Sequence, residues 1–399
     1  MGVYEENISF RMRWFYLCIC CCYSFWVRAS DSTSVVFKSG EAGYHTFRIP
    51  AIVRAPDQSL LAFCEGRVNN AGDFGDIKIV LRRSTDDGKT WLPIQVIAAM
   101  GNLQVGNPAP VVDVSDPAHP RGRIFLFYNT GDHHEYEVRK GNGLREVWYI
   151  SSTDNGLTWS DPVNITTSVH RPLQPQKNPN YSFQEDWRSY ANTPGHAMQF
   201  QQGPYRGRIF IAANHSAGEP QHQFEDYTAH GFYTDDHGKT FQLASSLAIK
   251  GSNESIATEI SNGRLMMNSR NQKGDIRARI VSISRNGGQT WDTSYFDTRL
   301  PDPVNQASLL TIGYRKGKAM LAFCNTASTT RRDSLSLRIS WDEGKTWPYQ
   351  QLIDASPKNF KGDYTAYSDL VYINKRTVGV LYERKGYGEI VFKRVTVSP

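Results

Sequence analysis

Three arginines, Arg48, Arg270 and Arg332, lie at or beside the ends of predicted strands in separate parts of a 399-residue chain. Guanidinium groups that share a site repel one another unless an anion lies between them. Arginine also carries a planar pair of N–H donors that binds a carboxylate or a phosphate through two hydrogen bonds. If the fold brings the three together, their ligand is an anion, and Arg67 adds a fourth cation. The competing interpretation of Arg332 is a solvated surface charge.

Acids and a phenol occupy similar positions. Glu254 and Tyr367 each start a predicted strand. A tyrosine beside a glutamate can give up its proton to it and become a nucleophile. Asp73 and Asp76 belong to a glycine-rich loop, residues 68–76, from which a carboxyl group can protonate a leaving group. A plain turn aspartate is the competing interpretation, and the acid role could fall to either residue.

A turn that recurs five times points to the elements that hold these residues. It follows the pattern Ser-x-Asp-x-Gly-x-Thr-Trp, here called an Asp-box, and its copies begin at Ser84, Ser152, Thr234, Ser284 and Ser340. The acidic side chain accepts backbone N–H bonds, glycine supplies a positive φ, and the aromatic residue is a buried plug. Phe241 replaces the tryptophan in the third copy and Asn286 the aspartate in the fourth. Five copies indicate a repeat protein.

Six apolar runs, each preceded by a turn and another short run, set the number of repeats. They begin at Leu60, Ile124, Ile209, Leu265, Met320 and Val378. A third strand leads into each Asp-box and a fourth leaves it. The pattern predicts an all-β fold over residues 31–399, a six-bladed β-propeller with four antiparallel strands per blade. Because the last unit lacks a fourth strand, the N-terminal run at residues 34–38 should close the ring. An open two-sheet sandwich would not explain six equal repeats.

In such a ring, the first strand of each unit begins, and the second ends, at one face of the disc. Polar residues from every blade then converge on the central axis, as a pocket for a polar small molecule requires. Asn107 and Glu383 join the arginines and acids named above at this mouth. A turn-forming role is the competing interpretation of each asparagine, whereas arginine is not a turn former.

The combination of motifs resembles the exo-α-sialidases (neuraminidases) of the bacterial and animal cellular type. The motifs are Phe47-Arg-Ile-Pro50, the five Asp-boxes, Asn253-Glu254, Asn268-Ser-Arg270 and Tyr367-Ser-Asp369. Asp-boxes alone occur in unrelated propellers, but the combination is specific and covers nearly all of residues 34–399.

The resemblance implies a role for each candidate residue. Arg48, Arg270 and Arg332 would hold the carboxylate of sialic acid. The further implied roles are Asp73 as acid/base, Tyr367 as nucleophile, Glu254 as its base, Glu383 as the carboxylate that orients Arg48, Arg67 as a pocket cation, and Tyr190 in a stretch near the glycerol side chain.

The implied reaction is hydrolysis of terminal sialic acid from glycoproteins, gangliosides or oligosaccharides, with retention through a tyrosyl-sialoside intermediate. Sialidases are the tyrosine exception among retaining glycosidases. The anomeric carbon of sialic acid already bears a carboxylate, which would repel a carboxylate nucleophile but not a neutral phenol. The alternatives are a trans-sialidase, a sialic acid-binding lectin without turnover, and a structural propeller that leaves the arginines unexplained.

The remaining features bound the cellular setting. Residues 1–30 contain an apolar run, 14–27, that fits a signal peptide, with a short anchor contacting a membrane as the alternative. Sequons at Asn164, Asn180, Asn214 and Asn253 support secretory entry, to a lysosomal or extracellular destination, although a glycan at Asn253 would conflict with a pocket at Glu254.

Beyond residue 30 the only cysteines are Cys64 and Cys324, both expected as buried thiols. The net charge of +6, without a dense basic run, argues against nucleic acid as a partner. Neither a cofactor nor a catalytic metal is expected.

Overall fold

The computed structural model describes residues 1–2 and 33–397. The chain divides into two units, Met1–Ser30 and Asp31–Pro399, and the second holds every described helix and strand. The expected signal peptide or anchor at residues 1–30 lies almost wholly outside the described residues. In the part that is described, no helix has the length and apolar character needed to cross a membrane.

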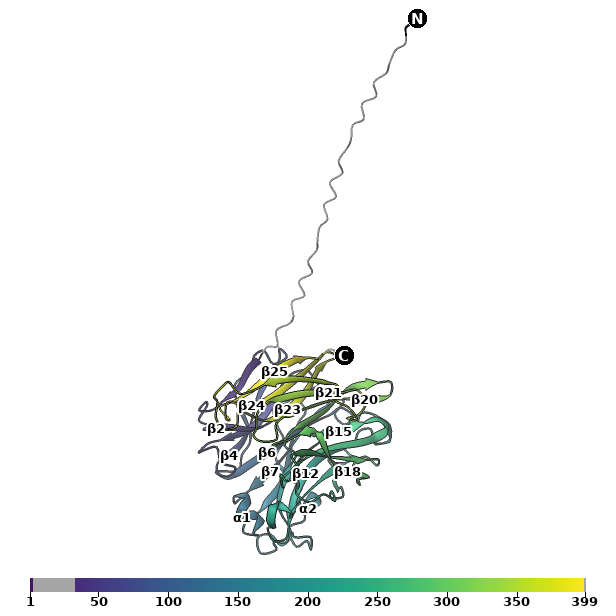
Figure 1. Ribbon diagram of the computed structural model, residues 1–399. Coiled ribbons are helices and arrows are strands. Elements are labelled where there is room, and N and C mark those ends of the chain that lie inside the picture. The colour runs from purple at the N-terminus through teal and green to yellow at the C-terminus, as the bar shows by residue number, and fades with distance from the viewer. Residues whose placement is uncertain (3–32, 398–399) are drawn as a thin grey trace. The chain divides into compact units, whose positions relative to one another are not determined.

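Four separate antiparallel sheets each form one blade (Figure 1). The first contains, in order, β1 (Thr33–Lys38), β25 (Glu389–Thr396), β24 (Thr377–Arg384) and β23 (Thr365–Asn374). The second contains β10 (Trp187–Asn192), β12 (Ile209–Ala217), β13 (Tyr227–Thr234) and β14 (Gln242–Leu243), with β11 (Met198–Gln199) also paired to β12. The third contains β15 (Ser252–Ile260), β16 (Arg264–Asn271), β17 (Ala278–Ser284) and β18 (Thr293–Pro301). The fourth contains β19 (Ser308–Arg315), β20 (Lys318–Thr326), β21 (Leu335–Ser340) and β22 (Tyr349–Asp354).

The other strands form one continuous eight-stranded sheet. Its members are β2 (Thr46–Arg54), β3 (Leu60–Arg67), β4 (Ile77–Ser84), β5 (Gln95–Ala98), β6 (Gln104–Asp113), β7 (Arg123–Gly131), β8 (Arg145–Ser152) and β9 (Val163–Asn164). A single parallel residue pair, Ile77 with Gln104, joins β4 to β6. The described strands therefore do not form six separate blades, as the sequence predicted, because the start of β6 runs beside β4 closely enough to share backbone hydrogen bonds.

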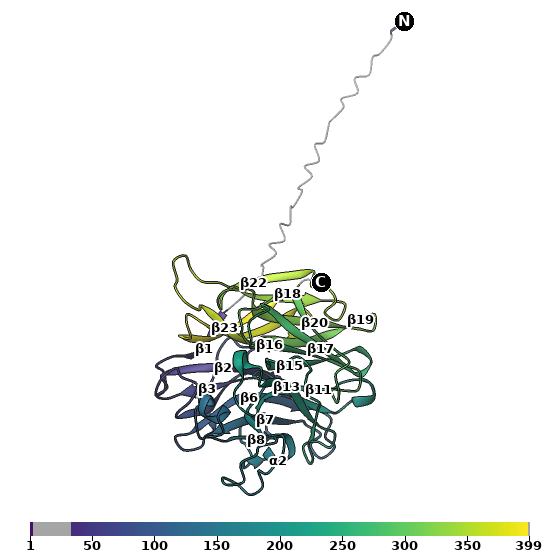
Figure 2. The same cartoon turned by 60° about the horizontal axis from the view of Figure 1, so that its bottom comes forward.

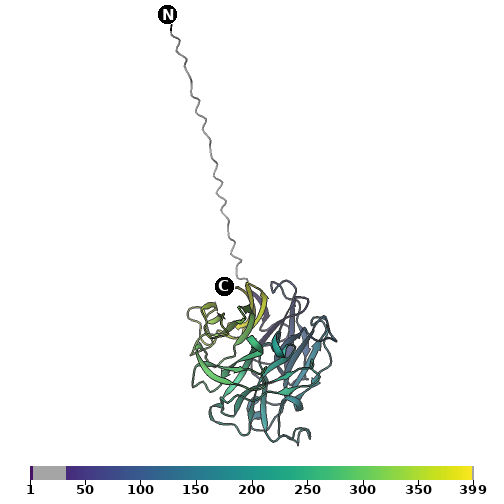
Figure 3. The same ribbon diagram turned by 90° about the vertical axis from the view of Figure 1, so that its right-hand side faces the viewer.

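The innermost strands contact one another in a closed circuit. The contacts run from β2 to β6, β11, β15, β19 and β23, and from β23 back to β2. The colour in Figures 2 and 3 passes accordingly from purple through teal and green to yellow and meets purple again. The meeting point is the antiparallel pairing of β1 with β25, which brings Thr33 opposite Lys393. The predicted closure by the N-terminal run is confirmed, and the arrangement is that of a β-propeller.

The Asp-boxes have the turn chemistry expected from the sequence. In the first copy, Asp86 Oδ1 accepts the backbone N–H groups of Lys89 and Thr90, both at 3.0 Å. The hydrogen bond from Thr90 is the main reason why the pKa of Asp86 falls to about 2. Four of the five box aromatic residues pack edge-on against phenylalanines, as Trp91 does on Phe392 of β25 with ring centroids 5.6 Å apart. The boxes therefore join neighbouring sheets and lie away from the pocket described below.

Buried clusters fill the space between successive sheets. Cys64 and Cys324 are both free and fully buried, as expected. The helices are short and lie in the connections: α1 (Glu135–Arg139), α2 (Thr166–Val169) and the 3₁₀ turns η1 (Gly203–Tyr205), η2 (His222–Phe224) and η3 (Ser261–Gly263). Of these, α1 matters for function because it places Glu135 at the pocket.

Candidate active site

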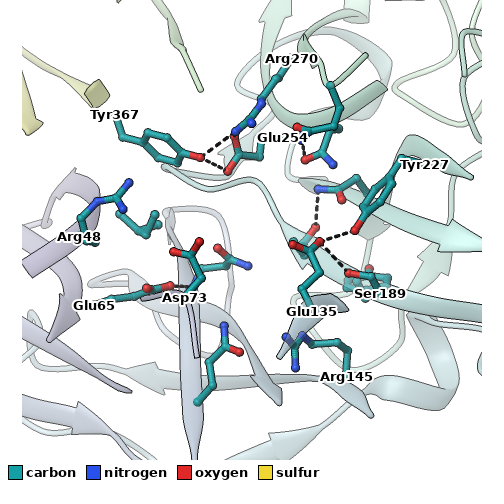
Figure 4. Close-up of a pocket in the computed structure, with 18 of the residues that line it drawn as sticks. Arg48, Glu65, Asp73, Glu135, Arg145, Ser189, Tyr227, Glu254, Arg270 and Tyr367 are labelled. Atoms are coloured by element: carbon teal, nitrogen blue, oxygen red, sulfur yellow. Dashed lines mark hydrogen bonds and ion pairs between the residues drawn. The ribbon is translucent and has the colours of Figure 1, made fainter. Parts of the chain in front are cut away.

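A cavity of ≈ 270 Å³ opens where the ends of the inner strands converge (Figure 4). Nine of the ten residues predicted for the site line it: Arg48, Arg67, Asp73, Asn107, Tyr190, Glu254, Arg270, Arg332 and Tyr367. The tenth, Glu383, is fully buried and hydrogen-bonded to Arg48. The fold therefore brings together side chains that are more than 300 residues apart in the sequence.

Backbone irregularities aim these side chains. The pairing register of five inner strands is interrupted near the cavity, between Arg48 and Ala51, Gly106 and Ala109, Trp187 and Tyr190, Ser252 and Ser255, and Thr365 and Ser368. Such bulges bend a strand and redirect its side chains. Two residues at these points, Ile49 and Asn107, have positive φ of 62° and 54°, which is costly for a β-branched isoleucine.

Tyr367, Glu254 and Arg270 form a compact hydrogen-bonded group. The Tyr367 hydroxyl donates to Glu254 Oε1 at 2.5 Å. Arg270 Nη1 donates to the Tyr367 hydroxyl at 3.0 Å and to Glu254 Oε2 at 2.7 Å. Burial, together with the Glu254 charge, raises the pKa of Tyr367 far above its usual range although three arginines oppose the shift. The phenol is therefore neutral at rest, with a base already accepting its proton.

Glu383 holds two parts of the site at once. Its Oε1 accepts from Arg48 Nε at 2.7 Å and from the Ile49 backbone at 2.8 Å. Its Oε2 accepts from the Tyr367 backbone at 3.1 Å. The carboxylate thus fixes the Arg48 side chain relative to the strand that carries Tyr367, and it leaves both Nη groups of Arg48 for other partners.

Arg48 and Arg332 flank the ring of Tyr367. Their guanidinium carbons lie 5.4 and 5.5 Å from its centroid. Among the described residues, Arg332 has no carboxylate within ion-pair distance, and its Nη1 donates to the hydroxyl of Tyr387 at 3.2 Å. With Arg270, three guanidinium groups, two from the strands β2 and β16 and one from the loop between β20 and β21, thus lie around one phenol.

Asp73 lies on the exposed side of the cavity. Its side chain is 70% exposed, and its Oδ1 accepts from Arg67 Nη1 at 2.7 Å. Burial raises the pKa of Asp73, but Arg67 and then Arg48 outweigh it, and the net pKa lies below the usual value. Asp76, the other acid of this loop, pairs with Lys78 at 3.0 Å and does not line the cavity. The geometry therefore favours Asp73 for contact with a ligand.

Asn107 and Tyr190 reach the cavity in different ways. The Asn107 backbone donates to Glu65 Oε1 at 2.9 Å, and Glu65 also binds Arg67, so the three form one wall. Tyr190 lines the cavity but is 1% exposed, and its ring packs on His170 with centroids 4.8 Å apart. Tyr190 therefore offers a ligand little surface.

Known proteins resemble the chain over most of its length. The family of BNR repeat-like domains matches residues 57–380. A sialidase of Micromonospora viridifaciens is 31% identical over 369 residues, covering 86% of this chain and 51% of the relative. Sialidase-2 of Mus musculus is 25% identical over 380 residues, covering 89% of this chain and 93% of the relative.

The chain belongs to the exo-α-sialidase family.

Solved structures extend the likeness of this sialidase-family chain. The Hadza microbial sialidase Hz136 has a TM-score of 0.74 at 26% identity, covering 91% of this chain and 68% of that one. The intramolecular trans-sialidase from Ruminococcus gnavus has a TM-score of 0.71 at 16% identity, covering 92% of this chain and 99% of that one, and shows the shared fold alone. The chain spans about half the length of the Micromonospora sialidase and 61% of a Bacteroides fragilis sialidase that it matches at 31% identity.

Sequence reasoning missed the wall of the sialidase-family pocket opposite Tyr367 (Figure 4). There the Tyr227 hydroxyl donates to Glu135 Oε1, and Ser189 Oγ donates to the same oxygen at 3.1 Å. Burial, with the Glu135 charge, raises the pKa of Tyr227. Arg145 lies below, 5% exposed, with its Nη1 donating to the His133 carbonyl at 2.9 Å. The charged stretch after Asn129, which interrupts the repeat, was the available signal.

Two expectations concern groups near or outside the pocket. Asn253 is 9% exposed and lines the cavity, and this burial favours the prediction that it carries no glycan. Away from the cavity, Asp113, Asp116 and His237 place possible metal-ligand atoms within 4.8 Å of one another, a group that sequence reasoning did not identify. His237 Nδ1 lies 2.8 Å from Asp113 Oδ2, so a hydrogen bond accounts for that pair.

Proposed function

We propose that the protein is a retaining exo-α-sialidase that hydrolyses terminal sialic acid from glycoconjugates through a tyrosyl-sialoside intermediate. One observation carries the proposal: the Tyr367 phenol donates a 2.5 Å hydrogen bond to Glu254 while three guanidinium groups lie around it. A nucleophile paired with its base, inside a cluster of cations, suits an anionic sugar.

Substrate binding begins with the carboxylate. Arg48 has its Nη atoms free of Glu383, and Arg332 has no competing carboxylate among the described residues, so both can bind a ligand oxygen. Arg270 completes the set and also touches the nucleophile. Charge-assisted bidentate bonds of this kind fix orientation as well as affinity. The substrate carboxylate thereby holds the anomeric carbon near the Tyr367 oxygen.

In the first step, the Tyr367 oxygen attacks the anomeric carbon as Glu254 takes the phenolic proton. The bond to the leaving oxygen breaks, and Asp73 supplies the proton that this oxygen needs. In the second step, Asp73 takes a proton from water and the water oxygen attacks the same carbon. The bond from this carbon to the Tyr367 oxygen breaks, and Glu254 returns its proton to that oxygen. Two inversions give net retention.

Arg67 holds the resting Asp73 in its ionised form, which is the wrong form for an acid. A bound sialoside changes this balance because its carboxylate adds negative charge near Arg48 and its body excludes water from the loop. Both changes raise the pKa of Asp73 toward the protonated form. The proposal therefore links protonation of the acid to arrival of the substrate.

Glycoproteins, gangliosides and sialylated oligosaccharides are the proposed substrates. The cavity lies among converging strand ends and is lined by buried and half-buried polar groups, which suits a terminal sugar. The wall formed by Glu135, Tyr227 and Ser189 offers hydroxyl and carboxylate groups to the polyhydroxylated end of the sugar.

We also propose that the ring has six functional blades. The eight-stranded sheet separates into β2 to β5 and β6 to β9, each with its own inner strand, and a single residue pair joins the halves. With the four separate sheets, the two halves give six groups around the pocket, five of four strands and one of five.

The test is release of the fluorophore from a fluorogenic α-sialoside by the purified protein, from about pH 4 to 7, beside Tyr367→Phe and Asp73→Ala. Release by the wild type and its loss in Tyr367→Phe are expected. Binding of the sialoside without release would favour a lectin, and formation of sialyllactose on adding lactose would favour transfer. Failure to bind or to release would overturn the proposal.

A further inference from the structure

Tyr387 contacts two of the three arginines, although it neither lines the cavity nor stood out in the sequence. It lies in the turn between β24 and β25. The guanidinium carbon of Arg48 lies over its ring, 4.1 Å from the centroid. Arg332 Nη1 donates to its hydroxyl at 3.2 Å. One neutral side chain therefore supports two like charges that would otherwise repel each other.

A hydrogen-bonded chain fixes the Tyr387 hydroxyl. It donates to Asp363 Oδ2 at 3.2 Å, and Asp363 Oδ1 accepts from the Arg332 backbone at 3.1 Å. The hydroxyl thus donates its proton to Asp363 and accepts a hydrogen bond from Arg332. Together the two partners fix the orientation of the O–H bond. Burial raises the pKa of Tyr387 although Arg332 and Arg48 oppose the shift, and this keeps the proton in place.

The backbone at Tyr387 is held in a costly conformation. Its φ is 68°, in the left-handed region that a bulky aromatic residue rarely adopts. Ser39 secures the turn, because its Oγ donates to the Tyr387 carbonyl at 2.8 Å and its N–H to the Gly388 carbonyl at 3.0 Å. The ring packs beside Ile49 and Tyr367. Strain that persists under such restraint is often found at functional positions.

We propose that Tyr387 is a positioning residue that sets the separation of Arg48 and Arg332 before the substrate carboxylate arrives. The ring supports Arg48 and the hydroxyl anchors Arg332, so the two contributions can be removed separately. The inference rests on the proposed function of the pocket, because it assigns the carboxylate of a sialoside to this arginine pair.

The test compares Tyr387→Phe, which removes the hydroxyl, with Tyr387→Leu, which also removes the ring. Tyr372→Phe, on β23 and outside this pocket, is the matched control. The probes are the unsaturated sialic acid analogue DANA and its methyl ester, and the dissociation constant of each is measured beside the thermal midpoint of each variant. Only DANA itself presents a carboxylate.

We expect Tyr387→Phe to weaken DANA binding about tenfold and Tyr387→Leu more, with little change for the ester or for Tyr372→Phe. For hydrolysis, KM should rise by a larger factor than kcat falls. Wild-type binding of DANA by either variant would overturn the proposal, as would equal losses for acid and ester. If the wild type binds DANA but releases no sialic acid from a sialoside, the proposed hydrolysis is refuted. The role of Tyr387 is then still tested by the DANA dissociation constants of its variants. If the wild type does not bind DANA, both proposals fall.

Discussion

Two glutamate–tyrosine pairs face each other across the same pocket and differ in the charges around them. Tyr367 bonds to Glu254 with Arg270 3.0 Å from its hydroxyl and two further guanidinium groups at its ring. Tyr227 bonds to Glu135 Oε1, an oxygen that also accepts from Ser189. The Arg139 guanidinium carbon lies 5.2 Å from the Tyr227 ring centroid, but Arg139 donates two hydrogen bonds to Asp226. Arg270 donates to the Tyr367 oxygen, where the charge of a phenolate develops, whereas Arg139 directs two of its donors at Asp226. The comparison supports the proposal that Tyr367 is the nucleophile: both phenols are paired with a glutamate, and we infer that the placement of the arginines decides which pair reacts.

The largest expected difference comes from removing each phenolic hydroxyl. Tyr367→Phe should lower kcat/KM by about 10⁴-fold because no nucleophile remains, whereas Tyr227→Phe should cost about tenfold and mainly raise KM. Steady-state release of a fluorophore measures both. Equal losses of kcat/KM in the two variants would show that the two tyrosines do not differ in role.

The next largest difference in activity should come from removing the charge of each glutamate. Glu254→Gln should lower kcat about 10²–10³-fold because the phenolic proton loses its acceptor. Glu135→Gln keeps a hydrogen-bonding oxygen for Tyr227 and should mainly change KM, by less than about tenfold. A fall in kcat for Glu135→Gln as deep as for Glu254→Gln would contradict the assignment.

The pH dependence of kcat/KM separates the two sides of the pocket when one arginine on each side, Arg67 or Arg145, is replaced. Arg67 lowers the pKa of Asp73, so Arg67→Met should raise that pKa and move the limb of kcat/KM that requires protonated Asp73 to higher pH. Arg145→Met, near Glu135, should leave this limb in place because no proton is transferred there. A movement of the limb to lower pH in Arg67→Met would refute the acid role of Asp73.

The smallest effect should come from a region remote from both pairs. The pKa of Asp86, about 2, lies below its unfolded value, so its contribution to stability is present above about pH 4 and is lost as pH falls through 2. Asp86→Asn should lower the melting temperature by about 1–3 °C at pH 7, with a difference that vanishes near pH 2 and with kcat unchanged. Calorimetry across pH checks this, and a changed kcat would show that the Asp-box communicates with the pocket.

Periodic features of the chain were predictable because each repeat has the same physical demands. The Asp-box turns, the apolar runs and the strand ends that carry Arg48, Glu254 and Tyr367 all follow from local pattern. The joining of β4 to β6 depends on one non-local residue pair, which a repeat pattern of six separate sheets does not contain. Glu135 and Tyr387 lie in irregular connections, and their contacts exist only after distant segments meet. The bulge at Ile49 is similar, since a register shift leaves no mark in the residue pattern.

The pairing of β1 with β25 has a consequence for biosynthesis. Thr33 pairs with Lys393, so β1 remains without this partner strand while the residues between them are synthesised. Until then β1 and β24 lack the strand that finally lies between them, and unpaired edges invite association with other chains. Closing the ring between segments far apart in the sequence is also slow, because the chain loses conformational entropy before the new contacts stabilise it. Newly made protein should therefore depend on chaperones up to the moment when the last strand is released.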